Sequence, residues 1–193
     1  PFNLCLMSNE TWDERYQQDG DLIKEPAGFL VKQLDRLPRG RALDLASGSG
    51  RNAVFLAAHG YPTDAVDSSA VAIEKLSSYA QRESLPLAGI RADLPDYRIE
   101  EQAYAVILNF YFLERKLFQP IQKGLAAGGM LLFETYTLEQ ARFGRPCNPE
   151  FLLKPNELLH GFRDLHIIYY HERIDYSGAS PRAIASLLAE KRG

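Results

Sequence analysis

Apolar residues recur along the chain at two spacings, one typical of buried strands and the other typical of helices. Short apolar runs predict strands at Arg41–Ala46, Thr63–Val66, Leu87–Arg91, Tyr104–Asn109 and Met130–Thr135. Apolar positions near a helical period predict helices at Thr11–Gln18, Pro26–Leu37, Arg51–His59, Ser69–Glu83 and Leu113–Leu125. Strands that alternate with helices indicate an α/β layer fold with a mostly parallel sheet.

The last third of the chain has a less regular pattern. A tight turn is expected at Ala126–Gly129, and Leu138–Gly161 carries three prolines without a clear period. Two further apolar runs, Leu165–Ile174 and Ala183–Glu190, are separated by a polar loop of hairpin length. The second run could be a helix by propensity, but we expect the two runs to form a hairpin, because a hairpin would cover an edge of the sheet.

Length and charge narrow the class of protein. The chain has 193 residues, which suits one domain, and its net charge of −3 argues against binding nucleic acid through phosphates. No apolar stretch reaches the roughly 20 residues of a membrane helix. Cys5 and Cys147 have no metal-ligand spacing, so no metal site is predicted, and such sparse cysteines are typical of a reducing compartment. We therefore expect a cytoplasmic protein, monomeric or homodimeric, without a nucleic-acid or membrane partner.

A glycine-containing loop, Ser47–Gly50, joins the first predicted strand to the helix that follows it. Glycines at such a junction let a small ligand touch the backbone, because a Cβ would collide with the ligand. The stretch Gly48–Ala53 matches the dinucleotide fingerprint G-x-G-x-x-A, and Asp67 follows at a suitable distance. An NAD-dependent oxidoreductase is therefore the rival interpretation of this fragment.

Asp44 favours a different ligand. It lies at the carboxyl end of the first strand, two residues before Ala46. A pyrophosphate at the N-terminus of the next helix would meet an uncompensated like charge there. The zwitterionic amino-acid end of S-adenosylmethionine presents an ammonium group and no phosphate, so this carboxylate favours S-adenosylmethionine over a dinucleotide.

Two further acidic residues follow the second and third strands. Asp67 can accept hydrogen bonds from both hydroxyls of a ribose. Asp67 or Ser68 could also cap the following helix, and the two roles can hold together. Asp93, with Leu94 beside it, can accept a hydrogen bond from an adenine amino group, and a turn role before Pro95 is the alternative. The order of these acids along the chain suits a nucleoside ligand.

The pattern D-x-A-x-G-x-G, an acid after the second strand and Asp-Leu after the third together resemble the motifs of class I S-adenosylmethionine-dependent methyltransferases. The stretch Leu43–Ala58 and the ending Ala185–Lys191 resemble, more narrowly, the tellurite-resistance-type methyltransferases and their bacterial relatives. The resemblance covers about Trp12–Lys191. It implies a Rossmann-like fold with a seven-stranded, mostly parallel sheet, helices on both faces and one antiparallel strand. The whole of 1–193 would form one methyltransferase domain, with N-terminal lid helices in 1–40 and the core in 41–193.

The pattern and the resemblance together predict a set of cofactor contacts. Tyr16 and Arg51 are assigned to the carboxylate end of the methionine moiety. The complete set is Tyr16, Asp44, Ala46, Ser47, Gly48, Arg51, Asn52, Asp67, Ser68, Asp93, Leu94 and Asn109.

The acceptor half carries weaker signals. After the fourth strand comes Asn109–Phe112, which lacks the Pro-Pro-aromatic sequence typical of methyltransferases that act on amino groups of nucleic acids. Its aromatic side chains could line an acceptor pocket, shield a sulfonium by cation–π contact, or pack in the core. Further candidates for the acceptor side are Glu134, Tyr136, Phe143, Arg145 and Asn148.

His171 is the predicted catalytic residue, because the pKa of a histidine lies near working pH, although a structural role is the alternative. The tellurite-resistance-type family carries a basic, histidine-containing segment here, and Glu172 interrupts the positive charge of His171 and Arg173. The predicted function is transfer of a methyl group from S-adenosylmethionine to a small soft nucleophile, such as a chalcogen oxyanion or a thiol. An oxygen or nitrogen acceptor, or a non-catalytic cofactor-binding module, are the alternatives.

Overall fold

The computed structural model describes residues 12–18, 25–178 and 180–193. Within these residues, seven strands form one sheet in the order β3-β2-β1-β4-β5-β7-β6. The strands are β1 (Ala42–Leu45), β2 (Thr63–Asp67), β3 (Leu87–Arg91), β4 (Tyr104–Phe110), β5 (Leu125–Tyr136), β6 (His166–Asp175) and β7 (Arg182–Glu190). Neighbouring strands are parallel except β7, which runs antiparallel to β5 and β6. The predicted seven-stranded, mostly parallel α/β fold is confirmed.

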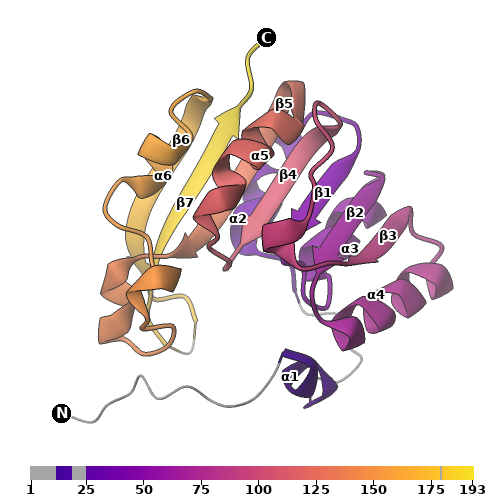
Figure 1. Cartoon of the computed structure of the whole chain (residues 1–193), viewed down its shortest axis with the longest axis horizontal. Coiled ribbons are helices and arrows are strands. Elements are labelled where there is room, and N and C mark those ends of the chain that lie inside the picture. Colours follow the sequence, from indigo (N-terminus) through magenta and orange to yellow (C-terminus); the bar gives the residue numbers. More distant parts are fainter. Residues whose placement is uncertain (1–11, 19–24, 179) are drawn as a thin grey trace.

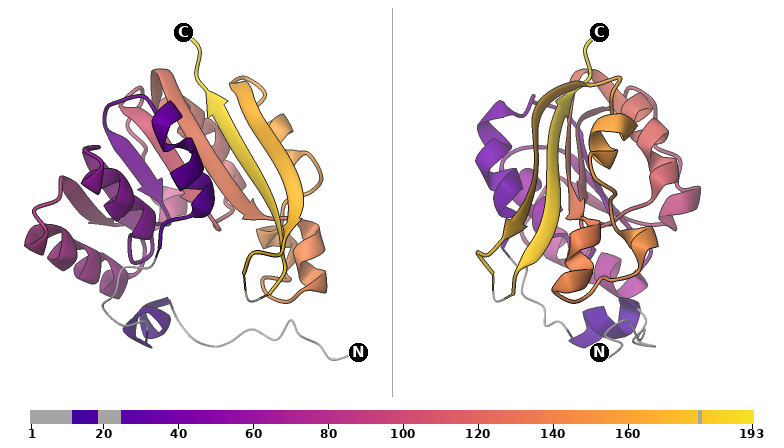
Figure 2. Two further views of the ribbon diagram at one scale, coloured as in Figure 1. Left: turned by 180° about the vertical axis from the view of Figure 1, so that it is seen from behind. Right: turned by 90° about the vertical axis from the view of Figure 1, so that its left-hand side faces the viewer.

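Helices cover both faces of the sheet, as the right-hand view of Figure 2 shows. Phe29 of α2 and Leu56 of α3 pack beside Leu108, whereas Phe118 of α5 packs beside Ile107. Ile107 and Leu108 are successive residues of β4 and therefore point to opposite faces. The helices are α1 (Trp12–Gln18), α2 (Gly28–Gln33), α3 (Arg51–Ala58), α4 (Ala70–Arg82), α5 (Phe118–Gly124) and α6 (Glu157–Gly161).

Strands β1 and β2 are buried along their whole length, because helices exclude water from both sides. Strands in this position consist largely of apolar residues, which is why the sequence predicts them well. Three aspartates interrupt the apolar runs. Asp64 pairs with Arg41 at 2.7 Å and accepts a hydrogen bond from the Tyr104 hydroxyl at 3.0 Å. Asp44 and Asp67 lie near the carboxyl ends of their strands and belong to the site described below.

The expected hairpin at the end of the chain forms between β6 and β7. Its last strand does not lie at the sheet edge, because β7 pairs with β5 on one side and with β6 on the other. The register places Glu134 of β5 opposite Ser186 of β7, and Ser186 opposite His171 of β6. This pairing brings residues from the last part of the chain next to the central strands.

The tight turn expected at Ala126–Gly129 is wrong. Strand β5 already begins at Leu125, which pairs with Tyr104, while Met130 pairs with Val106 two residues further along β4. The residues between Leu125 and Met130 form a bulge in β5, and Gly128 adopts a φ of 74° that glycine reaches without strain. The preceding helix is also shorter than expected, because a 3₁₀ turn, η3 (Arg115–Leu117), comes before α5.

The segment Leu138–Gly161 contains short helical pieces, η4 (Leu138–Arg142), η5 (Pro149–Phe151) and α6, instead of an extended irregular loop. The Arg115 guanidinium holds this segment by pairing with Glu157 at 2.6 Å. It also donates to the carbonyl oxygens of Glu150 and Leu152, at 2.7 and 3.1 Å. These contacts join positions 35 or more residues apart, so no local sequence pattern reveals them.

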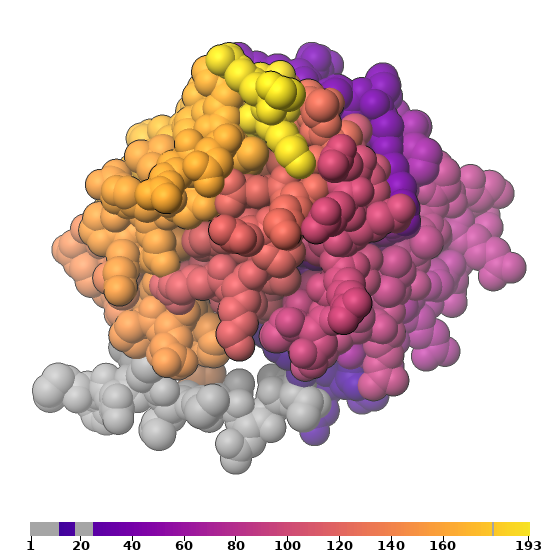
Figure 3. Space-filling model, turned by 45° about the horizontal axis from the view of Figure 1, so that its top comes forward, coloured from indigo at the N-terminus to yellow at the C-terminus, as the bar shows by residue number. Residues whose placement is uncertain are grey.

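The space-filling view in Figure 3 shows the orange and yellow last part of the chain, the magenta middle of the chain and the purple first half side by side. This arrangement follows the strand order, in which β6 and β7 lie at one side of the sheet and β2 and β3 at the other. Among the helices of the described residues, none has the length and apolar character needed to cross a membrane.

Candidate functional site

The candidate site lies at the carboxyl ends of the parallel strands, directly above α1 in Figure 1. The loop after β1, the end of β2 and the residue after β4 all reach this edge. Open α/β sheets bind ligands at the carboxyl ends of their strands, where the loops and helix N-termini converge. The predicted cofactor residues meet here with a cluster of aromatic and arginine side chains, of which only Arg182 is not among the predicted candidates.

The loop after β1 has an unusual backbone. Ala46, Gly48 and Gly50 have φ values of 55°, 54° and 86°, so three residues of this loop occupy the left-handed region. The Ser47 N–H donates to the carbonyl oxygen of Val66 at 3.0 Å, which ties the loop to β2. A left-handed alanine is strained, so this conformation of Ala46 persists because the surrounding contacts of the loop determine it.

Tyr16 of α1 covers the same loop. A Cβ added to Gly48 would meet the Tyr16 hydroxyl oxygen, and the φ of 54° at Gly48 disfavours any residue with a Cβ, so both observations favour glycine here. Two contacts hold α1 on the start of α4: Ser69 donates to Asp13 at 2.5 Å, and the Lys75 ammonium donates to the Tyr16 carbonyl at 2.9 Å. Of the two predicted lid helices, α1 lies over the loop, whereas α2 packs on the sheet.

Asp44 is 1% exposed and faces the start of α3, where it accepts a backbone hydrogen bond from Ala53. Burial raises the pKa of this carboxyl from 3.8 to about 7, with Arg51 opposing the shift and Asp67 adding to it. Among the described residues, neither Asp44 Oδ2 nor the nearby Ser47 Oγ has a hydrogen-bond partner. A buried carboxylate oxygen and a hydroxyl without partners fit the ammonium group of an amino acid.

Asp67 fixes the loop to β2. Its Oδ2 accepts the Gly48 N–H at 2.8 Å, and its Oδ1 accepts the Ser69 N–H at 2.9 Å. Each carboxylate oxygen retains a lone pair for a further donor, such as a ribose hydroxyl. The capping role suggested for Asp67 or Ser68 is wrong, because Ser69 is the N-cap of α4 and accepts the Ala72 N–H at 3.1 Å, while Ser68 is exposed.

The remaining predicted cofactor residues divide into two groups. Asp93 is exposed at the end of β3, next to buried Leu94, so its carboxylate is available to a ligand. Asn52 and Asn109 are buried and already bonded within the protein. The Asn52 side chain accepts the Ala27 N–H at 2.9 Å, and the Asn109 amide donates to the Phe112 carbonyl at 2.7 Å. The two asparagines therefore stabilise the surroundings of the loop.

Tyr111 is the centre of a cluster of aromatic and arginine side chains. It follows β4 with a φ of 57°, and its ring lies 5.2 Å from the ring of Tyr136 at the end of β5. The guanidinium carbons of Arg51 and Arg182 lie 5.6 and 5.8 Å from the centroid of the Tyr111 ring. Arg51 begins the helix directly after the glycine loop, so this cluster adjoins the cofactor residues.

Arg182 was not predicted, although it contributes the most specific group of this cluster. Its guanidinium pairs with Asp175 at 2.6 Å and donates to the Tyr111 hydroxyl oxygen at 3.2 Å. In the described part of the chain, the buried Arg182 Nε has no hydrogen-bond partner. A buried N–H donor of a cation is a strong candidate for binding an anion. Only the hairpin pairing brings this residue to the site, and no local motif marks it.

His171 lies away from this cluster. It is exposed on β6, and its Nδ1 lies 3.3 Å from the Tyr169 hydroxyl. Four strand spacings separate β6 from β1, which amounts to about 19 Å. Asn148, an acceptor-side candidate, accepts the Glu150 N–H at 3.0 Å and so holds a turn. The strand order therefore separates His171 from the glycine loop, and Asn148 stabilises a turn.

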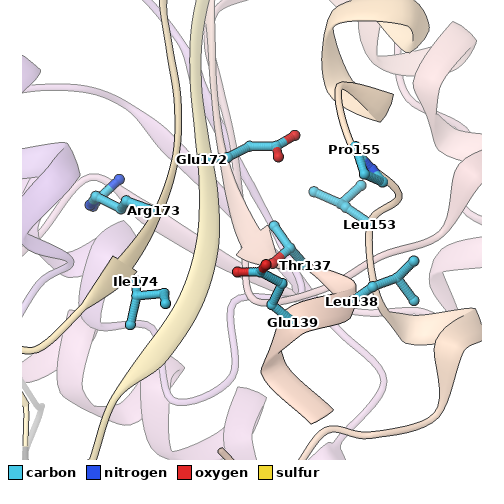
Figure 4. Close-up of a pocket in the computed structure, with 8 residues that line it drawn as sticks. All are labelled: Thr137, Leu138, Glu139, Leu153, Pro155, Glu172, Arg173 and Ile174. Atoms are coloured by element: carbon cyan, nitrogen blue, oxygen red, sulfur yellow. The ribbon is translucent and has the colours of Figure 1, made fainter. Parts of the chain in front are cut away.

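A separate cavity of about 350 Å³ lies beside β6, as the close-up in Figure 4 shows. Glu172 and Glu139 point into it, opposite Leu153 and Pro155. Glu172 already accepts hydrogen bonds from the Tyr170 hydroxyl and from the Asn156 N–H. None of the predicted cofactor residues lines this cavity.

The fold and the loop after β1 define a class I, Rossmann-like S-adenosylmethionine-dependent methyltransferase domain. Within that class, residues 12–178 match the family model described as tellurite resistance protein TehB, and the chain belongs to this family.

Solved structures resemble the whole fold. TehB from Haemophilus influenzae superposes with a TM-score of 0.77 at 21% identity, covering 94% of this chain and 67% of that chain. Geranyl diphosphate C-methyltransferase from Streptomyces coelicolor A3(2) was solved with S-adenosyl-L-homocysteine. It superposes with a TM-score of 0.68 at 12% identity, covering 84% of this chain and 76% of that chain. A curated relative, hemagglutinin 1 of Eikenella corrodens, is 29% identical over 143 residues, which are 69% of this chain. The match spans less than half of that relative, 46% of its length.

Proposed function

We propose that the chain binds S-adenosylmethionine at the loop Asp44–Gly50 and transfers its methyl group to a small anionic acceptor. Bound S-adenosylmethionine supplies an electrophilic methyl group on a sulfonium. The observation that carries the proposal is a buried hydrogen-bond acceptor and a buried hydrogen-bond donor, Asp44 Oδ2 and Arg182 Nε, each without a partner among the described residues. Arg51 lowers the pKa of Asp44 and lies 5.6 Å from the centroid of the Tyr111 ring, whose hydroxyl accepts a hydrogen bond from Arg182. Asp44 Oδ2 suits an ammonium group and Arg182 Nε suits an anion.

The cofactor half of the proposal uses residues with separate tasks. Asp44 would bind the ammonium group, and Tyr16 and Arg51 would lie near the carboxylate end of the methionine moiety. Asp67 retains lone pairs for the ribose hydroxyls while it holds the loop through Gly48. Asp93 is exposed at the next strand end, at a position suited to the adenine.

The acceptor half rests on charge and on the nature of the reaction. Arg51 and Arg182 both lie against the Tyr111 ring, and guanidinium groups bind oxyanions through charge-assisted hydrogen bonds. Holding an ionised acceptor in line with the methyl group supplies the proximity that such a displacement needs. A soft acceptor that is already ionised needs no general base, which agrees with the position of His171 on the outer strand. A chalcogen oxyanion or a thiolate meets these conditions, and the family description points to tellurium chemistry.

The test is a coupled assay of S-adenosylhomocysteine release with tellurite, selenite, thiols and phenols as acceptors. We expect turnover with an anionic soft acceptor, and an increase of about tenfold or more in its KM when Arg182 is replaced by glutamine, the scale of one charge-assisted hydrogen bond. Turnover restricted to neutral phenols or amines would instead favour oxygen or nitrogen methylation of a small metabolite. S-adenosylhomocysteine binding without any turnover would favour a non-catalytic module, and NAD binding alone would overturn the whole assignment.

A further inference from the structure

A buried carboxylate, Glu134, lies behind the acceptor side of the site. It sits near the end of β5 and is only 3% exposed. Its Oε1 accepts the Tyr111 hydroxyl at 2.8 Å, while its Oε2 accepts the Ser186 hydroxyl at 2.5 Å and lies 3.3 Å from the Arg173 guanidinium. A buried charge is tolerated only when partners of this kind surround it. Glu134 therefore joins β4, β6 and β7 at one point.

The same residue also fixes the backbone of Tyr111. The Tyr111 N–H donates to the Glu134 carbonyl oxygen at 2.7 Å, so backbone and side chain are both bonded to one residue. Tyr111 has a φ of 57°, a conformation that costs a residue other than glycine free energy. Such a conformation persists where surrounding contacts determine it, and these two hydrogen bonds do so here.

The hydrogen bonds at the Tyr111 hydroxyl have a definite direction. Burial raises the pKa of this phenol, and the neighbouring Glu134 carboxylate raises it further, so the hydroxyl keeps its proton. Its single proton is donated to Glu134, which leaves the oxygen lone pairs to accept the Arg182 N–H at 3.2 Å. The chain of donors therefore runs from Arg182 through Tyr111 to Glu134.

Arg182 is held on two sides by this arrangement. Asp175 binds one terminal nitrogen of the guanidinium, and Tyr111 binds the other, so the planar group has a fixed orientation. The remaining Nε is the buried donor without a partner among the described residues. The orientation of that donor thus depends on the Tyr111 hydroxyl and, behind it, on Glu134.

We propose that Glu134 is a positioning residue, which orients the Arg182 guanidinium toward the methyl acceptor through the Tyr111 hydroxyl. The proposal rests on the proposed function for the identity of the acceptor as an anion. Glu134 itself would not touch the acceptor, since its carboxylate is buried and bonded to Tyr111, Ser186 and Arg173. Its removal should weaken acceptor binding and leave the cofactor half intact.

The experiment compares Tyr111→Phe, Glu134→Gln and the control Tyr170→Phe. The control removes an equivalent tyrosine hydroxyl, which donates to Glu172 at the cavity beside β6. Binding of S-adenosylhomocysteine is measured by calorimetry, and selenite is then titrated into the complex; KM and kcat are measured with selenite where it is methylated. We expect Tyr111→Phe to weaken selenite binding about tenfold and to raise KM equally, with S-adenosylhomocysteine affinity changed less than twofold. Glu134→Gln keeps an oxygen that can accept the hydrogen bond of the Tyr111 hydroxyl, so its selenite affinity should fall by only about threefold. The selenite affinity of Tyr170→Phe should match that of the wild type.

Two outcomes would overturn the inference: unchanged selenite affinity in Tyr111→Phe, or an equal loss in Tyr170→Phe. A parallel loss of S-adenosylhomocysteine affinity would also overturn it, because it would indicate a general structural role. If the wild type binds selenite beside S-adenosylhomocysteine but does not methylate any acceptor, the proposed function fails, and the binding ratios still decide the role of Glu134. If the wild type does not bind selenite at all, both proposals fail.

Discussion

Replacing Asp44 by asparagine should stabilise the free protein above neutral pH and remove its affinity for S-adenosylhomocysteine. The reason is the raised pKa of this buried carboxyl, which is about 7 in the folded protein, compared with 3.8 for an aspartate in water. Between these values the unfolded chain releases a proton that the folded protein retains, so stability falls as pH rises from 3.8 toward 7. Above pH 7 the folded protein bears the full cost of a buried charge. Below 3.8 the carboxyl is neutral in both states and this cost is absent.

The size of the effect follows from the same two values. Each tenfold change in proton affinity is worth about 1.4 kcal/mol, so the ionised Asp44 destabilises the folded protein by about 4 kcal/mol. Asparagine removes this cost, but its amide would place a donor where Oδ2 now lacks a partner, at a cost of about 1–3 kcal/mol. The net gain above pH 7 is then about 1–3 kcal/mol, or roughly 2–10 °C in Tm for a domain of this size.

The assay is thermal unfolding of the wild type and Asp44→Asn between pH 4.5 and 8.5, with and without S-adenosylhomocysteine. We expect the variant to melt below the wild type at pH 4.5 and above it at pH 8.5. At pH 8.5, where Asp44 is ionised, S-adenosylhomocysteine should raise the Tm of the wild type, and the variant should show little response. Asp67→Asn is the matched control: Asp67 accepts two backbone hydrogen bonds, so its loss should lower Tm at both pH values. A Tm difference for Asp44→Asn that does not change sign with pH would refute the reasoning.

Three further outcomes are expected. Gly48→Val should abolish S-adenosylhomocysteine binding in calorimetry while the chain stays folded by circular dichroism, because a Cβ there meets the Tyr16 hydroxyl; normal binding would show that this loop is not the cofactor site. His171→Ala should retain kcat within about threefold for an ionised soft acceptor, whereas a loss on the order of 100-fold would indicate general-base catalysis of a hydroxyl acceptor. S-adenosylhomocysteine affinity should fall as pH drops from 8 to 6, since protonation of Asp44 removes the partner of the ammonium group, and a pH-independent Kd would contradict that assignment.

The strand, loop and helix that carry the proposed cofactor residues could be predicted because their information is local. Asp44, Gly48 and Gly50 lie within seven consecutive residues, and the strand, loop and helix that position them form one unit of the chain. Even here the prediction was imprecise by one residue at the helix cap, where Ser69 and not Ser68 accepts the backbone hydrogen bond. Hydroxyl and carboxyl side chains at adjacent positions are equally suited to capping, and only the backbone geometry selects one.

The acceptor half could not be predicted in the same way, because its residues meet through pairing of distant strands. Arg182 bonds to Tyr111 across 71 positions, and Tyr111 bonds to Glu134 across 23. Glu134 and the aromatic residues after β4 were recognised as candidates, but their mutual contacts depend on the strand order. His171 was selected by its chemistry alone, and the strand order that places β6 outermost separates it from β1.

The insertion of β7 between β5 and β6 has a consequence for the order in which the sheet can form during synthesis. Synthesis proceeds from the N-terminus, so the strands that carry Asp44 and Asp67 leave the ribosome before the strand that carries Arg182. Until β7 arrives, β5 has an open edge, and β6 has no neighbour among the strands that precede it. A nascent chain at this stage would already have its nucleoside-binding loop but would lack the acceptor arginine, and its free edge would invite aggregation. Translation that stops before Arg182 should therefore yield an insoluble product, and cofactor added during translation would act as a folding aid for the first half.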